Sequence, residues 1–307
     1  MKTFDELYDE LNFEELNKKT TEEHEKVVYF LVGIVVFLFF SIIIFNVSIF
    51  ENMNSEGQIL SAFIPTVLII GLAWKIFHKK SKENPKTYLE IYKEQIIAPM
   101  VKNCFKTSTY YPKKGLPKEE YNEMEYNEDY NYYKSEDLIE AEINTKNNDK
   151  IFMRFSDIYV SKIEENSEKN FFRGMIGHIK IDKEIPSYIK ITTKNDINKT
   201  EQVLMDSTKF EKYFNVESSD KIISMQILTS DIMLNMIDIW NKTNVEFEIL
   251  IKNNNINLRF FTGNMFESSM DELKIERKKI LKKYYDILEF IKQISIQIHD
   301  AIDEADI

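Results

Sequence analysis

The stretch VVYFLVGIVVFLFFSIIIFNVSIF, residues Val27–Phe50, is followed after eight residues by ILSAFIPTVLIIGLAWKIF, residues Ile59–Phe77. Each run is close to the roughly 20 apolar residues that an α-helix needs to cross the hydrocarbon core of a bilayer. Because the link between the runs is so short, the second helix must return antiparallel to the first. The two runs therefore predict a transmembrane helical hairpin over residues 27–77.

The charges around the two runs predict the orientation of this hairpin. The link Glu51–Gln58 carries acids and no Lys or Arg, whereas lysines precede the first run and close the second. By the positive-inside rule, both termini face the cytoplasm and the membrane protein is multi-pass. Neither run holds Asp, Glu, Arg or His at mid-membrane depth, so the hairpin is expected to be an anchor rather than a transport path.

The remaining chain is predicted to form two cytoplasmic parts. Residues 1–26 are an amphipathic helical arm with an acidic outer face, which disfavours docking on an anionic membrane. We expect this arm to pack on the rest of the protein, with binding to a partner as the alternative. Residues 78–307 are long enough to form an α+β domain with its own core. Apolar residues define the inner face of the arm: Phe4, Leu7, Tyr8 and Leu11.

The region between Leu138 and Thr193 has the period of β-strands. Apolar and polar residues alternate at its start, and further apolar stretches are separated by polar residues, which predicts an antiparallel meander. A hairpin is expected where two apolar runs flank Lys252–Asn255, since asparagine tolerates the positive φ of a tight turn. We expect an antiparallel sheet of about six or seven strands, with barrel-like closure as one form that it could take. The predicted strands are Leu138–Asn144, Ile151–Ile163, Phe171–Ile181, Tyr188–Thr192, Val245–Ile251 and Ile256–Phe261.

Helices are predicted to flank this sheet, and the longest runs from about Ser269 to Ala301. Apolar residues along it recur at alternating spacings of four and three, as in a coiled coil. This stripe is either an interface with another chain or a face packed on the protein's own sheet. Leu281, Leu288 and Phe290 widen it and favour the second interpretation. The stripe consists of Ile280, Tyr284, Ile287, Ile291, Ile294 and Ile298.

Residues that could carry chemistry are scattered. The chain has seven glycines and no phosphate-binding loop, and its four histidines lack the spacing of zinc ligands. Ser135-Glu136-Asp137 precedes the first of these strands, and no acidic partner for its carboxylates is identifiable. Cys104 is the one cysteine, which excludes an intramolecular disulfide. We therefore expect no enzyme activity, no cofactor and no metal.

The word Phe171-Phe172-Arg173-Gly174 is the one candidate binding feature. An arginine between aromatic residues and a glycine suits a stacked guanidinium and a close approach of another backbone. One interpretation is a strand with a bulge at Gly174. The other is a groove that binds a ligand carboxylate or a peptide end, anchored by Arg173. The net charge of −11 and the lack of a Lys/Arg stripe argue against nucleic-acid binding.

Several short segments of the sequence, taken in order, resemble segments of a bacterial family of two-pass membrane proteins. That family is known only as a domain of unknown function, and some of its members carry the name galanin. The resemblance covers about residues 85–290. It implies a bacterial inner or plasma membrane and brings no activity and no catalytic residue. The segments that carry the resemblance are Tyr110–Gly115, Tyr133–Ile139, Phe155–Ile158, Phe171–Gly174, Phe210–Val216, Ile227–Thr229 and Phe266-Glu267.

These observations lead to two expected functions. The first is a membrane-anchored cytoplasmic interaction module, a scaffold or sensor without catalysis, whose partners are the lipid bilayer and either a protein partner or a second copy of the chain. The second is a homo-oligomeric pore or membrane-remodelling assembly. Small and hydroxyl residues in the hairpin and the stripe of the last helix motivate this alternative.

Overall fold

The computed structural model describes residues 2–50, 87–145, 147, 149–193, 202–267 and 270–305. The chain divides into two compact units, one formed by residues 12–92 and the other by residues 1–11 together with 93–307. The second predicted membrane helix, Ile59–Phe77, lies outside the described residues.

The unit of residues 12–92 is helical where it is described. α2 (Glu14–Phe50) contains the whole first apolar run and exposes apolar side chains between Val28 and Phe37. α4 (Tyr88–Tyr92) begins at a capping box, because the Glu90 amide donates to the Thr87 hydroxyl at 3.2 Å and the Thr87 amide donates to the Glu90 carboxylate at 3.0 Å.

Counted over the described residues, no single helix is long and apolar enough to cross a membrane. One pair of helices, Lys221–Ile227 and Ser230–Thr243, bent by 71°, meets the requirement together, by length and composition only.

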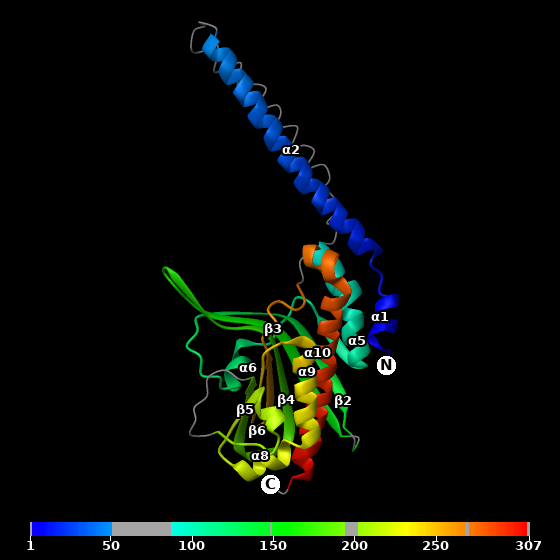
Figure 1. Ribbon diagram of the computed structural model, residues 1–307, viewed down its shortest axis with the longest axis vertical. Coiled ribbons are helices and arrows are strands. Elements are labelled where there is room, and N and C mark those ends of the chain that lie inside the picture. Colours follow the sequence, from blue (N-terminus) through cyan, green and yellow to red (C-terminus); the bar gives the residue numbers. More distant parts are fainter. Residues whose placement is uncertain are drawn as a thin grey trace. The chain divides into compact units, whose positions relative to one another are not determined.

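The larger unit is built on one six-stranded antiparallel sheet (Figure 1). The order is β1-β2-β3-β4-β5, with β6 paired to β4, which confirms the predicted meander. Barrel-like closure is wrong, because the sheet is open. The outer side of β5 pairs instead with the preceding segment, where the Val203 amide donates to the Val216 carbonyl at 2.8 Å. The strands are β1 (Thr107–Tyr111), β2 (Tyr132–Asn144), β3 (Lys150–Glu164), β4 (Ser167–Thr193), β5 (Phe214–Ser218) and β6 (Phe247–Phe260).

β6 doubles back on itself inside this sheet. The Phe261 amide donates to the Glu246 carbonyl at 2.9 Å, and the rings of Phe247 and Phe260 stack with centroids 5.5 Å apart. A straight strand of this length would hold its ends about 40 Å apart. Asn253, with φ 54°, lies at the turn, which confirms the predicted hairpin.

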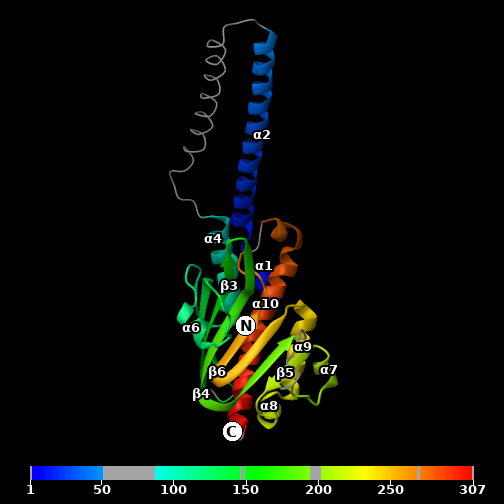
Figure 2. The ribbon, with the colours of Figure 1, turned by 90° about the vertical axis from the view of Figure 1, so that its left-hand side faces the viewer.

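β4 bends around this hairpin. Its residue Met175 pairs with Phe260 and its residue Thr192 pairs with Glu248, so the two halves of β4 flank the two halves of β6 (Figure 2). The register shifts between Lys180 and Ile185, where β4 curves. The two strands predicted at Phe171–Ile181 and Tyr188–Thr192 are therefore halves of one bent strand.

Helices cover both faces of the sheet. Phe260 stacks edge-to-face on Phe290 of α10, whereas its neighbour Arg259 contacts Tyr121 of α6. Successive strand residues point to opposite faces, so α10 and α6 lie on opposite sides. Figure 1 shows α9 beside α10. The helices of this unit are α1 (Phe4–Glu10), the π-helix η1 (Lys93–Ile97), α5 (Ala98–Cys104), α6 (Lys118–Glu123), α7 (Thr208–Glu211), α8 (Lys221–Ile227), α9 (Ser230–Thr243) and α10 (Met270–Glu304).

The apolar stripe of α10 lies largely in the core of this unit. Ile280 and Tyr284 are half-buried, and the other four residues of the stripe are fully buried: Ile287, Ile291, Ile294 and Ile298. The N-terminal arm also packs here, because Phe4 of α1 is buried with its ring 5.5 Å from that of Tyr285. Both helices thus use their apolar faces within the same unit.

Candidate functional site

The structure places the residues of the predicted groove, Phe171–Gly174, on β4 in different surroundings. Phe172 is buried in the sheet, whereas Arg173 is exposed with its guanidinium 5.3 Å from the Tyr159 ring centroid. The close backbone approach at Gly174 is real, since a Cβ there would lie 1.9 Å from the Phe260 carbonyl oxygen. The register shift in this pairing lies at Phe171, not at Gly174.

A different arginine has the environment expected for Arg173. Arg259 is buried, and its guanidinium lies 4.0 Å from the Tyr126 ring centroid and 4.4 Å from that of Phe172. It also forms an ion pair with Glu128 at 2.8 Å. We call Arg259, Tyr126, Phe172 and Glu128 the arginine clamp. Apolar and polar residues alternate around Arg259 in the sequence, so Asn257 and Arg259 lie on the face opposite to their apolar neighbours. This alternation could have identified Arg259 from the sequence.

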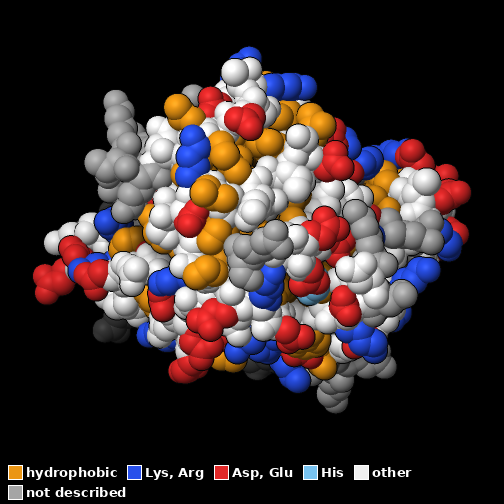
Figure 3. All heavy atoms as spheres, turned by 90° about the horizontal axis from the view of Figure 1, so that it is seen from below, with side chains coloured by type: hydrophobic (Ala, Val, Ile, Leu, Met, Phe, Trp, Pro, Cys, Tyr) orange, Lys and Arg blue, Asp and Glu red, His pale blue; other side chains and the backbone are white. Residues whose placement is uncertain are grey.

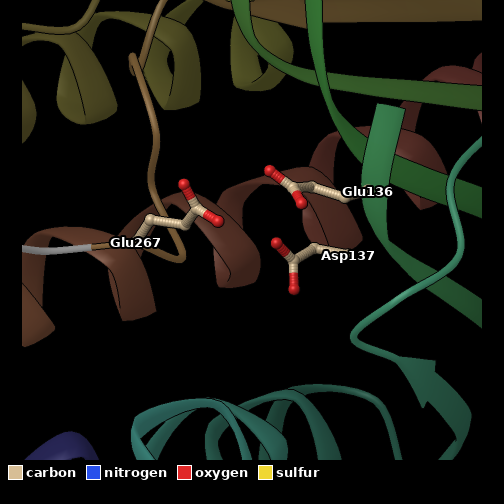
Figure 4. Close-up of side chains that lie close together, drawn as sticks. All are labelled: Glu136, Asp137 and Glu267. Carbon is tan, nitrogen blue, oxygen red and sulfur yellow. The ribbon is translucent and has the colours of Figure 1, made fainter. Parts of the chain in front are cut away.

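Four carboxyl groups from three separate segments of the sequence lie close together in the same unit. One oxygen each from Glu136, Asp137 and Glu267 lies within 4.8 Å of the other two (Figure 4). Asp157 is the cross-strand neighbour of Glu136, and its Oδ2 accepts a hydrogen bond from the Phe266 amide at 3.2 Å. We call these four residues the carboxylate cluster.

The local backbone of β2 places Asp137 in the cluster. The pairing of β2 with β3 is irregular between Glu136 and Ile139, and Asp137 has φ 60°. Positive φ is uncommon outside glycine, and a bulge of this kind redirects a side chain. Ser135 fixes the start of the bulge, since its Oγ accepts from the Leu116 amide at 2.9 Å and lies 2.8 Å from Ser156 Oγ.

Gly115 allows the preceding loop to reach this bulge. A Cβ at Gly115 would lie 2.3 Å from the backbone carbon of Ser135, so a larger residue cannot occupy the position without displacing the strand. The neighbouring Lys114 carbonyl accepts from the Leu138 amide at 2.9 Å. The loop and the bulge therefore depend on one another.

Lys93 supplies the buried positive charge of the site. Its side chain is 5% exposed, and its Nζ lies 2.6 Å from Asp137 Oδ2 and 3.6 Å from Glu267 Oε1. Lys93 opens the π-helix η1, a rare form often associated with functional positions. Pro99 at the start of α5 lacks an amide donor and clashes with a regular preceding turn, which accounts for the wider turn before it.

Burial governs the protonation of the cluster. Burial raises the pKa of Asp137 to about 6, although hydrogen bonds from Lys93 and Tyr110 favour its charged form. Burial, and then the nearby charge of Asp137, raises the pKa of Asp157. For Glu136, burial is the largest influence and acts in the same direction. The hydrogen bond from Lys134 and the charges of Lys93 and Lys134 together outweigh it, so the pKa of Glu136 lies below its ordinary value.

The charges of this site do not balance. Four carboxyl groups face Lys93, which is buried, and Lys134, whose side chain is 49% exposed. No cysteine or histidine belongs to the carboxylate cluster. Such an arrangement can hold a proton or a cation between carboxylates.

The expectation that Ser135-Glu136-Asp137 has no acidic partner was wrong. Asp157 and Glu267 lie 20 and more residues away along the chain, and only the sheet brings them to the same point. Four of the sequence segments that carry the family resemblance also lie at this site. They are the segments that contain Tyr110, Ser135, Asp157 and Glu267. Their order in the sequence gave no sign of this convergence.

The other residue types considered from the sequence lie elsewhere. Burial raises the pKa of the Cys104 thiol well above its ordinary range, so this cysteine is not a reactive thiolate. His178 is buried, with its Nδ1 2.7 Å from the Asn257 side-chain oxygen. Neither residue belongs to the carboxylate cluster.

Comparison with known proteins gives a family match over part of the chain. Residues 170–298 match a family model described as "Protein of unknown function (DUF3137)". The crystal structure of the mycobacterial trehalose monomycolate transport factor A, TtfA, is similar with a TM-score of 0.32 and 9% identity, over 62% of this chain and 93% of that chain. A similarity at this level says nothing about function. No curated protein matches this sequence.

Proposed function

We propose that this protein is a membrane-anchored cytoplasmic interaction module, a scaffold or sensor, and that it is not an enzyme. The two apolar runs of the sequence support the anchor, together with the lysines that flank them. The α+β unit that follows supplies the surface for interaction.

The buried ion pair between Lys93 and Asp137 is the observation that carries this proposal. Lys93 follows directly after α4 in the chain, and α4 follows the segment that contains the second apolar run. The ammonium of Lys93 contacts Asp137 at 2.6 Å inside the folded unit. This contact attaches the chain to the sheet soon after the second predicted membrane helix in the sequence, and a sensor would need such an attachment to join its membrane part to its cytoplasmic part.

The polar groups of the unit support binding rather than catalysis. The arginine clamp and the carboxylate cluster hold charged groups in contact with each other, and neither set of four residues includes the serine, cysteine or histidine of a nucleophile–base pair. On the face shown in Figure 3, basic and acidic side chains are mixed among hydrophobic ones, without a field of one charge. Such mixed surfaces suit protein partners better than polyanions.

The alternative of a homo-oligomeric pore used the α10 stripe as its interface. Most of that stripe is buried beneath other parts of the same unit, including Ile291 and Ile294. An oligomer through this face would have to expose these side chains, so the interaction module is the function that we favour.

Two measurements test the proposal. Carbonate extraction of membranes shows whether the protein is anchored. Light scattering on the full chain, purified in mild detergent, gives its molar mass. We expect the protein to resist carbonate and to carry one defined partner in a fixed ratio. A variant lacking residues 27–77 should appear in the carbonate-soluble fraction. Release of the unaltered protein by carbonate, or a turnover activity lost on a point substitution, would contradict the proposal.

A further inference from the structure

We propose that the carboxylate cluster binds a hard divalent cation, Ca²⁺ or Mg²⁺, through side-chain oxygens of Glu136, Asp137 and Glu267. This inference deepens the proposed function, on which its biological meaning rests, by naming a ligand for the site beside Lys93. Cation binding itself can be measured whether or not the protein is a membrane-anchored module.

The spacing of the oxygens suits one ion. Ca²⁺ binds oxygen ligands at about 2.3–2.6 Å, so two ligands of the same ion lie at most about 5 Å apart. One oxygen each from Glu136, Asp137 and Glu267 meets this limit, with all separations within 4.8 Å. In Figure 4 the three carboxylates converge from two elements, β2 and the segment before α10.

Asp157 provides an independent indication of a missing ligand. The residue is 5% exposed, and its Oδ1 has no hydrogen-bond partner among the described residues, whereas its Oδ2 accepts a hydrogen bond from the amide of Phe266, next to Glu267. Asp157 is also the cross-strand partner of Glu136, which places it beside the cluster. A buried polar oxygen without a partner is costly, so it points to a bound group beside the cluster.

The charge and chemistry of the site select the class of cation. Four carboxyl groups against two lysines leave an excess of negative charge that a divalent ion would neutralise. The oxygen-only ligand set suits Ca²⁺ or Mg²⁺, whereas zinc sites in proteins draw chiefly on Cys and His. Asn264 supports Glu267 from outside, because its amide donates to the Glu267 carboxylate at 2.7 Å.

Lys93 makes this site different from a simple acidic patch. Its ammonium already contacts Asp137 and lies 3.6 Å from Glu267, so the cation and Lys93 share the same carboxylates. Like charges at this separation repel each other. Removal of the lysine charge should therefore tighten cation binding, an effect that a purely structural ion pair does not predict.

The experiment is isothermal titration of the full chain in mild detergent with CaCl₂ and, separately, MgCl₂, after removal of metal with EDTA. We expect one site per chain, and an affinity about tenfold weaker or more in Glu267→Gln and in Glu136→Gln. Glu142→Gln is the matched control, because Glu142 lies further along β2 and pairs with Lys150 at 2.8 Å. Its affinity should equal that of the unaltered protein.

Three results would overturn the inference: no binding of either ion at millimolar concentration, binding that Glu267→Gln leaves unchanged, or weaker binding in a folded Lys93→Met variant. Circular dichroism shows whether each variant is folded, and Glu136→Gln replaces Glu267→Gln if the latter is not. If the protein resists carbonate and purifies with its partner but binds no cation, this inference alone is refuted. A protein that binds the cation but is released by carbonate would refute the proposed function alone.

Discussion

The arginine clamp and the carboxylate cluster are two buried charged regions of the same sheet, and they differ in their charge balance. In the clamp, one arginine meets one carboxylate at 2.8 Å and two aromatic faces. In the cluster, four carboxyl groups meet two lysines, one of which is half exposed. A balanced pair of this kind fixes structure, whereas an unbalanced cluster retains the capacity to take up charge.

The two regions also respond differently to burial. Burial opposes the charge of Arg259, but Tyr126, Tyr121 and Glu128 outweigh it and raise the pKa of the guanidinium. In the cluster, burial prevails and raises the pKa of Asp137 to about 6. The clamp therefore keeps its charge and the cluster tends to lose one. The following predictions test this contrast.

Lys93→Met should have the largest effect on stability. The change leaves Asp137 and Glu267 without the buried ammonium group of Lys93. Removal of one partner of a buried ion pair lowers the free energy of unfolding by about 3–5 kcal/mol. Urea denaturation followed by circular dichroism measures the loss. Lys134→Met is the control, since Lys134 is 49% exposed and loss of such a pair costs less than about 1 kcal/mol. Equal losses in the two variants would show that the cluster is no less solvated than the surface.

Arg259→Met should cost somewhat less, about 2–3 kcal/mol, because methionine can still fill the space between the aromatic rings while Glu128 loses its partner. The matched control is Arg173→Met, a change at an exposed arginine, which we expect to alter stability by at most about 0.5 kcal/mol. The same denaturation experiment compares them. A larger loss of stability in Arg173→Met than in Arg259→Met would contradict this comparison and favour the role that the sequence predicted for Arg173.

Gly115→Ala should cost about 1–3 kcal/mol, as expected when a methyl group is forced into a packed site. The added Cβ would lie 2.3 Å from the Ser135 backbone, so the bulge that carries Asp137 must shift. Gly263→Ala is the comparison, since Gly263 has φ +65° but open space around it, and its cost is only the strain of about 1–2 kcal/mol. Cation affinity should fall in Gly115→Ala and remain unchanged in Gly263→Ala, as titration with CaCl₂ can show.

Glu267→Gln should have the smallest effect in the absence of cations. It removes one charge from an excess of carboxylates, so we expect a change between zero and a gain of about 1 kcal/mol, opposite in sign to Lys93→Met. Thermal denaturation in EDTA measures it. In saturating CaCl₂ the order should reverse, because ligand binding stabilises the unaltered protein and not the variant. A destabilised variant in EDTA would mean that Glu267 is needed to pair Lys93.

Much of the fold could be predicted because it depends on local patterns. The alternation in β2 and β3, the asparagines at the β6 turn and the apolar stripe of α10 are each contained in a short stretch of chain. β1 was missed because Tyr110 and Tyr111 lie next to a Pro/Gly loop, which obscures a five-residue edge strand. The joining of two predicted strands into the bent β4 was also missed, since the curve follows from its pairing with the β6 hairpin.

The sequence by itself determined where apolar residues recur, and thereby most of the helices and strands. It also contains no known catalytic motif. Only the tertiary structure decided which polar groups meet. Arg173 and Arg259 each stand beside phenylalanines in the sequence, yet one is exposed and the other buried, because only Arg259 lies where residues before β2 cover the sheet. Likewise Asp137, Asp157 and Glu267 come together through strand register and a bulge, and register depends on pairing between distant segments that no local pattern encodes.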